Sequence, residues 1–280
     1  MTSNVPASEP VSTGCPLNIS REDLVEAPFP HIIKDGFLRD DLYRRLVAEF
    51  PRDEQFDAAS TVGARSGRDL YPGDPGYDEL LGESPAWREL KEWIDSKEYV
   101  DLVMDLFGPY MREFDCAIDP SQASYVPFVE PRDVMKKRSR LAQKFQDVKD
   151  NLSSKKTTND IFVRMDIAQG GVGYKKGVHC DRPNRVTTML VYLCDAEENE
   201  QVGGDLHVHK PVEAKPYRSY SRHPQDSEVE KILDLRPAHN RGVFFLCTNN
   251  SYHSVDPVIS QKNYRNYIYT SASSHAPVIW

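Results

Sequence analysis

The chain has 280 residues, a net charge of −8 and 39% apolar residues. This length and composition suit one large globular domain, or a core with substantial additions. The acidic balance argues against general nucleic-acid binding, and no apolar run approaches the roughly 20 residues of a membrane span.

The five cysteines are odd in number and widely spaced, and none forms a Cys-x-x-Cys pair. They are typical of reduced thiols in a cytoplasmic protein. Residues 1–14 have neither a basic cluster nor an apolar run, so we expect no signal peptide and no membrane anchor there.

The first part of the chain is predicted to be irregular and helical. Residues 1–20 mix Ser, Thr, Pro and Asn without periodicity, which predicts a disordered N-terminus. Three amphipathic helices are expected, at about 40–50, 84–94 and 97–107, and Gly108-Pro109 is expected to end the third. Residues 52–83 carry Gly, Asp and Pro with little periodicity and are predicted to be loop.

A basic segment follows. Eight Lys and Arg residues lie between Lys136 and Lys156, against only Asp147 and Asp150. In an acidic protein, such an excess could draw an anionic substrate toward a site. A solvated surface helix is the alternative interpretation.

From Ile161 onward the pattern is that of β-strands. Strands are expected at 161–167, 173–181, 186–193, 204–209, 242–247, 253–259 and 264–271, and residues 227–235 fit either a strand or a short helix. The run from Val186 to Leu193 is almost continuously apolar, so this strand should be buried on both faces. We therefore predict a mainly β fold, a jelly roll or barrel with helices packed outside.

His179 and Asp181 stand two residues apart in one of these strands, so their side chains should point to the same face. An imidazole beside a carboxylate can chelate Fe(II), Mn(II) or Zn(II). With 8 His and 43 acidic residues, chance alone predicts roughly one such pair. The pair by itself therefore does not indicate a metal site, and the surrounding sequence is needed.

That surrounding sequence resembles the non-haem Fe(II), 2-oxoglutarate-dependent oxygenases, and within them the prolyl-hydroxylase-like branch. The resemblance covers residues 28–51 and 161–272. It is carried by the order of the following pieces: His179-x-Asp181, the strand ending in Tyr192-Leu193, Gly203-Gly204-Asp205-Leu206, Gly242-Val-Phe-Phe, His253-Ser-Val-x-Pro257-Val258 and Arg265.

The resemblance implies a fold and a domain plan. It implies a double-stranded β-helix (jelly roll) core at 161–272, on which a helical and irregular part at 39–160 packs. Together they would form a single 2-oxoglutarate oxygenase domain spanning 21–280.

The resemblance also implies the site. His179, Asp181 and His253 match the family's iron ligands, and Arg265 matches the base that holds the distal carboxylate of 2-oxoglutarate. A guanidinium suits that role because it is a permanently charged, bidentate fork. Fe(II) would be the cofactor and 2-oxoglutarate and O₂ the cosubstrates, with ascorbate as a stimulant.

Further residues have open roles. Tyr192 and Thr188 would either hydrogen-bond 2-oxoglutarate or pack in the core, and Arg164 and Tyr174 lie on strands that could face the substrate. Arg185 and Lys262 are the next candidates for the distal carboxylate if Arg265 does not hold it. His207 and His209 form a second pair at the same spacing, but no third ligand follows them, so we interpret them as pocket lining or surface.

The expected activity is oxidation, in first place hydroxylation, of a C–H bond of a small metabolite, with succinate and CO₂ as products. The carboxylate of Asp181 indicates hydroxylase rather than halogenase chemistry, because halogenases of this family have Gly or Ala there. Two alternatives stay open: hydroxylation of a protein side chain, and a cupin-like metal-binding protein or isomerase without oxygen chemistry. The expected partner is a small, possibly anionic substrate, with no nucleic acid and no membrane, for a monomer or homodimer.

Overall fold

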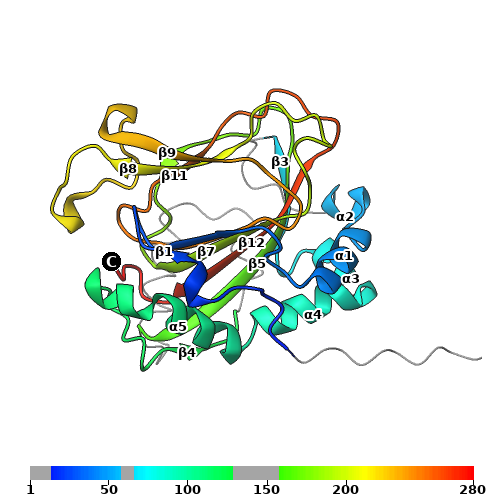
Figure 1. Ribbon diagram of the computed structural model, residues 1–280. Helices are drawn as coiled ribbons and strands as arrows, with labels where there is room; N and C mark the ends of the chain where they lie inside the picture. Colours follow the sequence, from blue (N-terminus) through cyan, green and yellow to red (C-terminus); the bar gives the residue numbers. More distant parts are fainter. Residues whose placement is uncertain (1–13, 58–65, 129–157) are drawn as a thin grey trace, which may run out of the picture.

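The strand predicted to be buried on both faces is β7 (Arg185–Tyr192), and it lies in the interior of the larger of two facing sheets. A computed structural model describes residues 14–57, 66–128 and 158–280 of the protein. All eight residues of β7 are buried, as predicted. Figure 1 shows the larger sheet between the smaller sheet on one side and helices on the other.

The larger sheet has the order β1-β2-β10-β7-β12-β5-β3, with β4 paired to β5. Its other strands are β1 (Leu24–Val25), β2 (His31–Lys34), β3 (Gly67–Leu70), β4 (Ser124–Tyr125), β5 (Asp160–Gly170), β10 (Gly242–Leu246) and β12 (Arg265–Ser274). The smaller sheet has the order β6-β11-β8-β9. It consists of β6 (Lys176–His179), β8 (Leu206–Pro211), β9 (Val229–Leu235) and β11 (His253–Val255). Two facing sheets of this kind form the predicted double-stranded β-helix.

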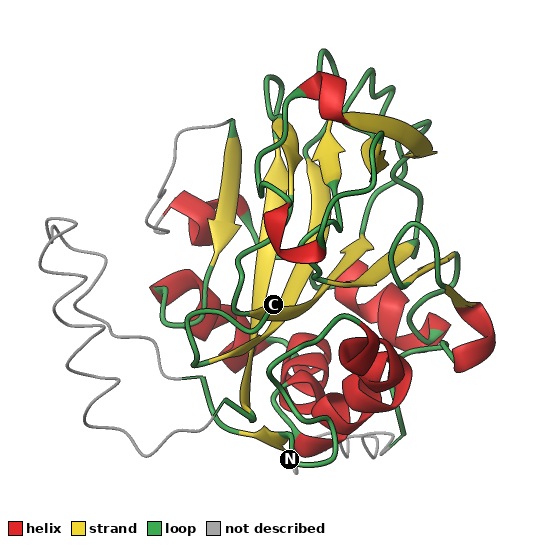
Figure 2. Cartoon of the chain, turned by 90° about the vertical axis from the view of Figure 1, so that its left-hand side faces the viewer, coloured by secondary structure: helices red, strands yellow, loops and turns green. Residues whose placement is uncertain are grey.

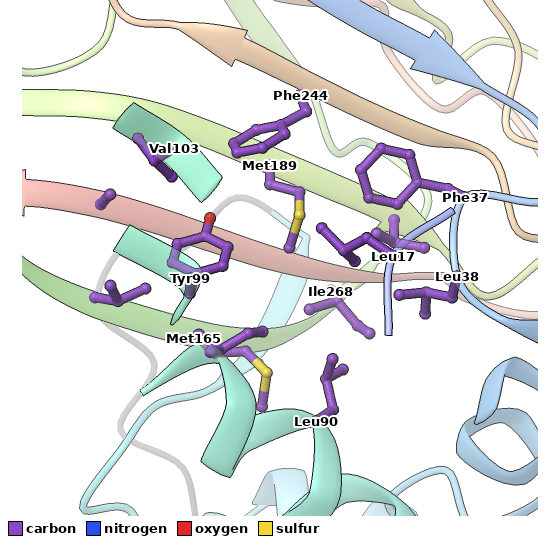
Figure 3. Packing of buried hydrophobic residues seen from close by; sticks show 14 of the residues in the cluster. Leu17, Phe37, Leu38, Leu90, Tyr99, Val103, Met165, Met189, Phe244 and Ile268 are labelled. Atoms are coloured by element: carbon purple, nitrogen blue, oxygen red, sulfur yellow. The ribbon is translucent and has the colours of Figure 1, made fainter. Parts of the chain in front are cut away.

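Alternation along the strands produces two cores. In β7, Met189 and Val191 belong to the cluster shared with the helices, whereas Leu190 and Tyr192 belong to the cluster between the two sheets. Figure 3 shows Met189 and Phe244 of the sheet packed against Tyr99 of a helix. Because both faces of the sheet are covered, its central strands β7 and β10 are buried along their whole length.

The described helices are α1 (Asp40–Ala48), α2 (Asp53–Asp57), α3 (Pro75–Glu83), α4 (Pro85–Ile94) and α5 (Lys97–Glu113), with short 3₁₀ turns at Arg21–Asp23, Tyr217–Ser219 and Asp226–Glu228. Most of the α-helices lie in the lower half of the view in Figure 2. The predicted start of α4 is confirmed, since the hydroxyl of Ser84 accepts a hydrogen bond from the main-chain N–H of Trp87.

Two predictions about this region are wrong. Residues 52–83 contain α2, β3 and α3 rather than loop alone, and β3 pairs with β5 at the edge of the larger sheet. The third helix does not stop at Pro109 but continues to Glu113. Burial of Met111 holds the added turn, and N–H groups of Phe114 and Cys116 cap the carbonyls of Tyr110 and Met111.

In the second half of the chain the expected strands are present. Residues 229–235, the ambiguous segment, form strand β9. The strand predicted at 173–181 is shorter, so that Asp181 lies two residues beyond the end of β6. Gly203 has a φ of +74°, and a Cβ there would lie 2.1 Å from the carbonyl oxygen of Pro257, so this turn requires glycine.

Residues 14–20 belong to the segment predicted to be disordered, yet Leu17 is buried and pairs with Leu38. The basic residues from Lys136 to Lys156 lie outside the described residues. Among the helices that the structure describes, none is long and apolar enough to span a membrane.

Candidate active site

The side chains of His179, Asp181 and His253 converge between the two sheets. One nitrogen or oxygen atom from each residue lies within 4.8 Å of the other two, and all three residues are buried. His179 and His253 are direct cross-strand partners in the β6–β11 pair, which brings together residues far apart in sequence.

The two imidazole rings make the same kind of contact to the main chain. Nδ1 of His179 lies 2.9 Å from the carbonyl oxygen of Gly177, and Nδ1 of His253 lies 3.0 Å from that of Ser251. A carbonyl oxygen only accepts hydrogen bonds, so Nδ1 carries the proton in each ring and Nε2 keeps a free lone pair. Nε2 of His179 is buried and has no hydrogen-bond partner within the described ranges. Two such nitrogens and a carboxylate fit a divalent metal of the Fe(II) kind.

Asp181 is held by three neighbours although it lies outside a strand. Thr188 donates a hydrogen bond to Oδ2 at 2.6 Å, Arg185 contacts Oδ1 at 2.5 Å, and the thiol of Cys247 lies 3.6 Å from Oδ2. Burial opposes ionisation of this carboxyl, but the charge of Arg185 and the positive groups around it lower its pKa below the usual range. Asp181 is therefore ionised and fixed in direction, as a metal ligand needs to be.

The two histidines are kept neutral. Burial, together with the nearby His253 and Lys176, lowers the pKa of His179 to about 2. Burial likewise lowers the pKa of His253. Neutral imidazoles bind metal ions without first losing a proton.

Arg265 is the most unusual charged residue of the site, because it is only 1% exposed. Its Nη2 donates a hydrogen bond to the hydroxyl of Tyr192 at 2.8 Å, and its guanidinium lies 4.9 Å from the ring centres of Tyr192 and Tyr267. Its Nε has no partner, and no acidic side chain of the described segments forms an ion pair with it. A buried cation without a counter-ion is costly, so the pocket around Arg265 suits an anion.

A cavity of about 360 Å³ opens beside His179 and Asp181. Its wall is formed by residues of β3, β5, β6, β7 and β12 and of the segment before β9, and these include Arg164, Tyr174, Arg182 and Arg222. Arg265 does not line this cavity. The site therefore has an open cavity at His179 and Asp181 and a separate buried cation, Arg265.

A comparison with protein families decides what kind of site this is. The family model described as the 2OG-Fe(II) oxygenase superfamily matches residues 163–270, a range that contains the three converging side chains and Arg265. Residues 163–270 belong to the 2OG-Fe(II) oxygenase superfamily. Fe(II) is accordingly its cofactor, and 2-oxoglutarate and O₂ are its cosubstrates.

Solved structures similar to this oxygenase in overall trace are distant in sequence. A prolyl-4-hydroxylase from Pseudomonas putida is 14% identical, with 87% of this chain and 92% of that chain covered and a TM-score of 0.47. A prolyl hydroxylase from Trichoplax adhaerens, in complex with a hypoxia-inducible factor peptide, is 13% identical (88% and 84% covered, TM-score 0.43). The non-haem epimerase SnoN from nogalamycin biosynthesis is 10% identical (87% and 76% covered, TM-score 0.45). No curated protein matches the chain in sequence.

The other predicted site residues lie at the cavity, beside Arg265 or Asp181, or in a separate ion pair. Arg164 and Tyr174 line the cavity, and Tyr192 contacts Arg265. Thr188 hydrogen-bonds Asp181, a contact that its sequence position alone did not indicate. Both alternative bases are engaged elsewhere, Arg185 with Asp181 and Lys262 with Glu200.

The second histidine pair stands apart from the triad. The ring nitrogens of His207 lie 2.5 and 2.7 Å from carboxylate oxygens of Asp234 and Asp256, and His209 contacts the hydroxyl of Ser254. Neither histidine belongs to the one group of potential metal ligands found among the described residues.

Sequence reasoning missed Arg182, Arg222 and the contact between Arg185 and Asp181. Asp181 and Arg185 stand four residues apart at a strand boundary, where this spacing does not predict a contact. Arg222 lies in a segment without periodicity, so its place in the site could not be predicted.

Proposed function

We propose that this oxygenase hydroxylates a C–H bond of a small metabolite in the cytoplasm, with 2-oxoglutarate converted to succinate and CO₂. The observation that carries the proposal is the combination of the His179, Asp181 and His253 group with a buried, uncompensated Arg265. A metal-binding cupin without oxygen chemistry would not need such a buried cation in the same domain.

His179, Asp181 and His253 would hold Fe(II), which when bound would activate O₂, the oxidant of the reaction. Three protein ligands leave the rest of the coordination sphere for the keto acid end of 2-oxoglutarate and for O₂. Arg265 and the hydroxyl of Tyr192 would bind the distal carboxylate of 2-oxoglutarate through charge-assisted hydrogen bonds.

Further residues would set the orientation of the carboxylate ligand. Thr188 and Arg185 contact different oxygens of Asp181 and so restrict its rotation. Arg185 also contacts the hydroxyl of Tyr269, which ties the carboxylate to the larger sheet. Asp181 at this position supports hydroxylation rather than halogenation, since the carboxylate fills the place that a halide would take.

The cavity supports a small molecule as substrate. Its volume of about 360 Å³ lies within the range of small-ligand pockets, roughly 300–1,000 Å³. All five cysteines are free thiols, which supports a reducing compartment.

Mass spectrometry of reactions with a metabolite panel tests the proposal, with succinate release as the readout. A product heavier than its substrate by one oxygen atom, formed only with Fe(II), 2-oxoglutarate and O₂, is the expected result. A chlorinated product, or a product formed without O₂, would contradict hydroxylation. A hydroxylated peptide in a parallel peptide panel would replace the small molecule as substrate class.

A further inference from the structure

The cavity beside His179 and Asp181 is rich in charge, and cationic groups are in excess. Five cationic side chains and three carboxylates line it. The cationic residues are Arg164, Lys176, Arg182, Arg185 and Arg222, and the carboxylates are those of Asp69, Asp166 and Asp181. Such an excess is unexpected in a protein whose net charge is −8.

All three carboxylates are already engaged within the cavity wall. Asp181 contacts Arg185 at 2.5 Å, and Asp166 contacts Arg164 at 2.7 Å. Asp69 accepts a hydrogen bond from the hydroxyl of Tyr71 at 3.0 Å. Even with all three carboxylates ionised, the five cationic side chains leave the wall with an excess of two positive charges.

Arg222 is fixed close to the metal-binding side chains without a carboxylate partner. Its Nε donates to the carbonyl oxygen of Asp181 at 2.9 Å, and its Nη2 donates to that of Cys180 at 3.3 Å. Main-chain oxygens carry no net charge, so these bonds orient the guanidinium without neutralising it. No ion pair to an acidic residue involves Arg222 in the part of the chain that the structure describes.

Arg182 adds a second such cation at the mouth of the cavity. It directly follows Asp181, its side chain is exposed, and it forms no ion pair with any acidic residue in the described ranges. Its electrostatic neighbours include the guanidinium groups of Arg185, Arg164 and Arg222, which repel it. Four arginines thus share one wall with only two carboxylates that pair with them.

Loading of the site does not remove this excess. Bound Fe(II) and bound 2-oxoglutarate have opposite charges of equal size, and the distal carboxylate of 2-oxoglutarate is assigned to Arg265, which lies outside the cavity lining. The cationic wall therefore remains for another ligand.

We propose that this cavity binds the substrate through an oxyanion group, a carboxylate or a phosphate, held by Arg182 and Arg222. The inference rests on the proposed function for its claim that the ligand is the substrate. Guanidinium groups bind both kinds of oxyanion through paired, charge-assisted hydrogen bonds. The oxidised C–H bond would then lie between this group and the metal, within the length of a small molecule.

Binding of two probes to the full chain tests the proposal. Inorganic phosphate is titrated and followed by ³¹P NMR, and ¹³C-labelled acetate is titrated and followed by ¹³C NMR. Both titrations are made with Mn(II) bound and 2-oxoglutarate at saturation, so that the Arg265 pocket is filled. The variants are Arg182→Gln, Arg182→Lys and, as a matched control, Arg44→Gln, which removes an exposed arginine paired with Asp40 on α1.

We expect the wild type to bind at least one probe saturably. Bound Mn(II) should broaden the NMR signal of that probe more in the wild type than in the Arg182→Gln protein. Arg182→Gln should weaken binding about ten- to a hundred-fold, the usual effect of losing a hydrogen bond to a charged group. Arg182→Lys should weaken it less, and Arg44→Gln should not change it. The probe that binds more tightly identifies the oxyanion as phosphate or carboxylate.

Absence of saturable binding of both probes, or equal dissociation constants for the wild type and Arg182→Gln, would overturn the proposal. If the Gln variant does not fold, unchanged binding by Arg182→Lys overturns it, because the lysine cannot form the bidentate contact. Calorimetric titration of the wild type with Mn(II) and 2-oxoglutarate is read separately. Failure of those two ligands to bind would refute the proposed function, whereas the phosphate and acetate constants decide the oxyanion site.

Discussion

His179 of β6 and His253 of β11 are cross-strand partners, and each turns its Nδ1 toward the carbonyl oxygen two residues before it in the chain. The same local contact in two paired strands gives both rings the same tautomer. The ring centres lie 4.2 Å apart, and Nε2 of His253 is 3.9 Å from Oδ2 of Asp181. These main-chain contacts leave both Nε2 atoms with a free lone pair, so both could bind one metal ion.

Metal binding should depend on both histidines. We expect His179→Ala and His253→Ala each to abolish stoichiometric Fe(II) or Mn(II) binding, since two remaining ligands hold a divalent ion poorly. His239→Ala is the matched control, because this exposed histidine contacts Glu198 and does not belong to the triad. Anaerobic calorimetry measures the stoichiometry. Binding of one metal ion per chain by both triad variants would show that the ion sits elsewhere.

The hydroxyl of Thr188 should influence metal affinity through Asp181. Thr188→Val keeps the shape of the side chain but removes the hydrogen bond to Oδ2, so metal affinity should fall by about 10- to 100-fold, the usual effect of losing a partner behind a ligand. Thr187→Val is the control, because Thr187 is the adjacent buried residue of β7 and faces away from Asp181. Equal metal affinities of the two valine variants would refute this role of Thr188.

The guanidinium of Arg265 should determine the affinity for 2-oxoglutarate. Arg265→Lys keeps the charge but loses the fork, so binding of 2-oxoglutarate should weaken by about 1.5–3 kcal/mol, while metal binding stays unchanged. Tyr192→Phe removes only one neighbouring hydroxyl and should cost less, about 0.5–1.5 kcal/mol. Calorimetric titration with 2-oxoglutarate in the presence of Mn(II) measures both effects. An unchanged constant in Arg265→Lys would assign the distal carboxylate to another base.

Stability of the metal-free protein should fall in acid because His179 is buried in its neutral form. Its pKa is lowered from 6.5 to about 2, so between these values the unfolded chain binds a proton that the folded chain does not. The free energy of unfolding is therefore fully retained above about pH 6.5 and decreases below it, by about 1.4 kcal/mol per pH unit for one such group. Urea unfolding at pH 7.5 and 5.5 should show a smaller decrease for His179→Asn than for the wild type. Parallel decreases would contradict the assigned cause.

The triad could be predicted from the sequence because strand periodicity and the order of the family's motifs both point to the same residues. His179 and Asp181 have the spacing of a shared strand face, and His253 carries its own motif. The structure brings all three together, although Asp181 lies just beyond the end of its strand. The buried strand β7 was likewise evident from its almost continuous apolar run.

Other parts depend on packing that no local pattern reveals. Strand β3 has the composition of a turn and exists because it pairs with the edge of β5. Arg182 and Arg222 come from irregular segments, and only the folded chain brings them to one wall. The role of Thr188 follows from the direction in which Asp181 turns, which depends equally on Arg185.

Formation of succinate from 2-oxoglutarate is the most direct test of the central claim that this chain is an Fe(II)- and 2-oxoglutarate-dependent oxygenase with its metal on His179, Asp181 and His253. Wild-type protein loaded with one equivalent of Fe(II) and 2-oxoglutarate without oxygen is mixed with O₂, and succinate is quantified by mass spectrometry. We expect succinate from the wild type only when Fe(II) and O₂ are both present, and none above background from Asp181→Asn. Wild-type protein that forms no succinate, or Asp181→Asn protein that forms as much as the wild type, would contradict the account.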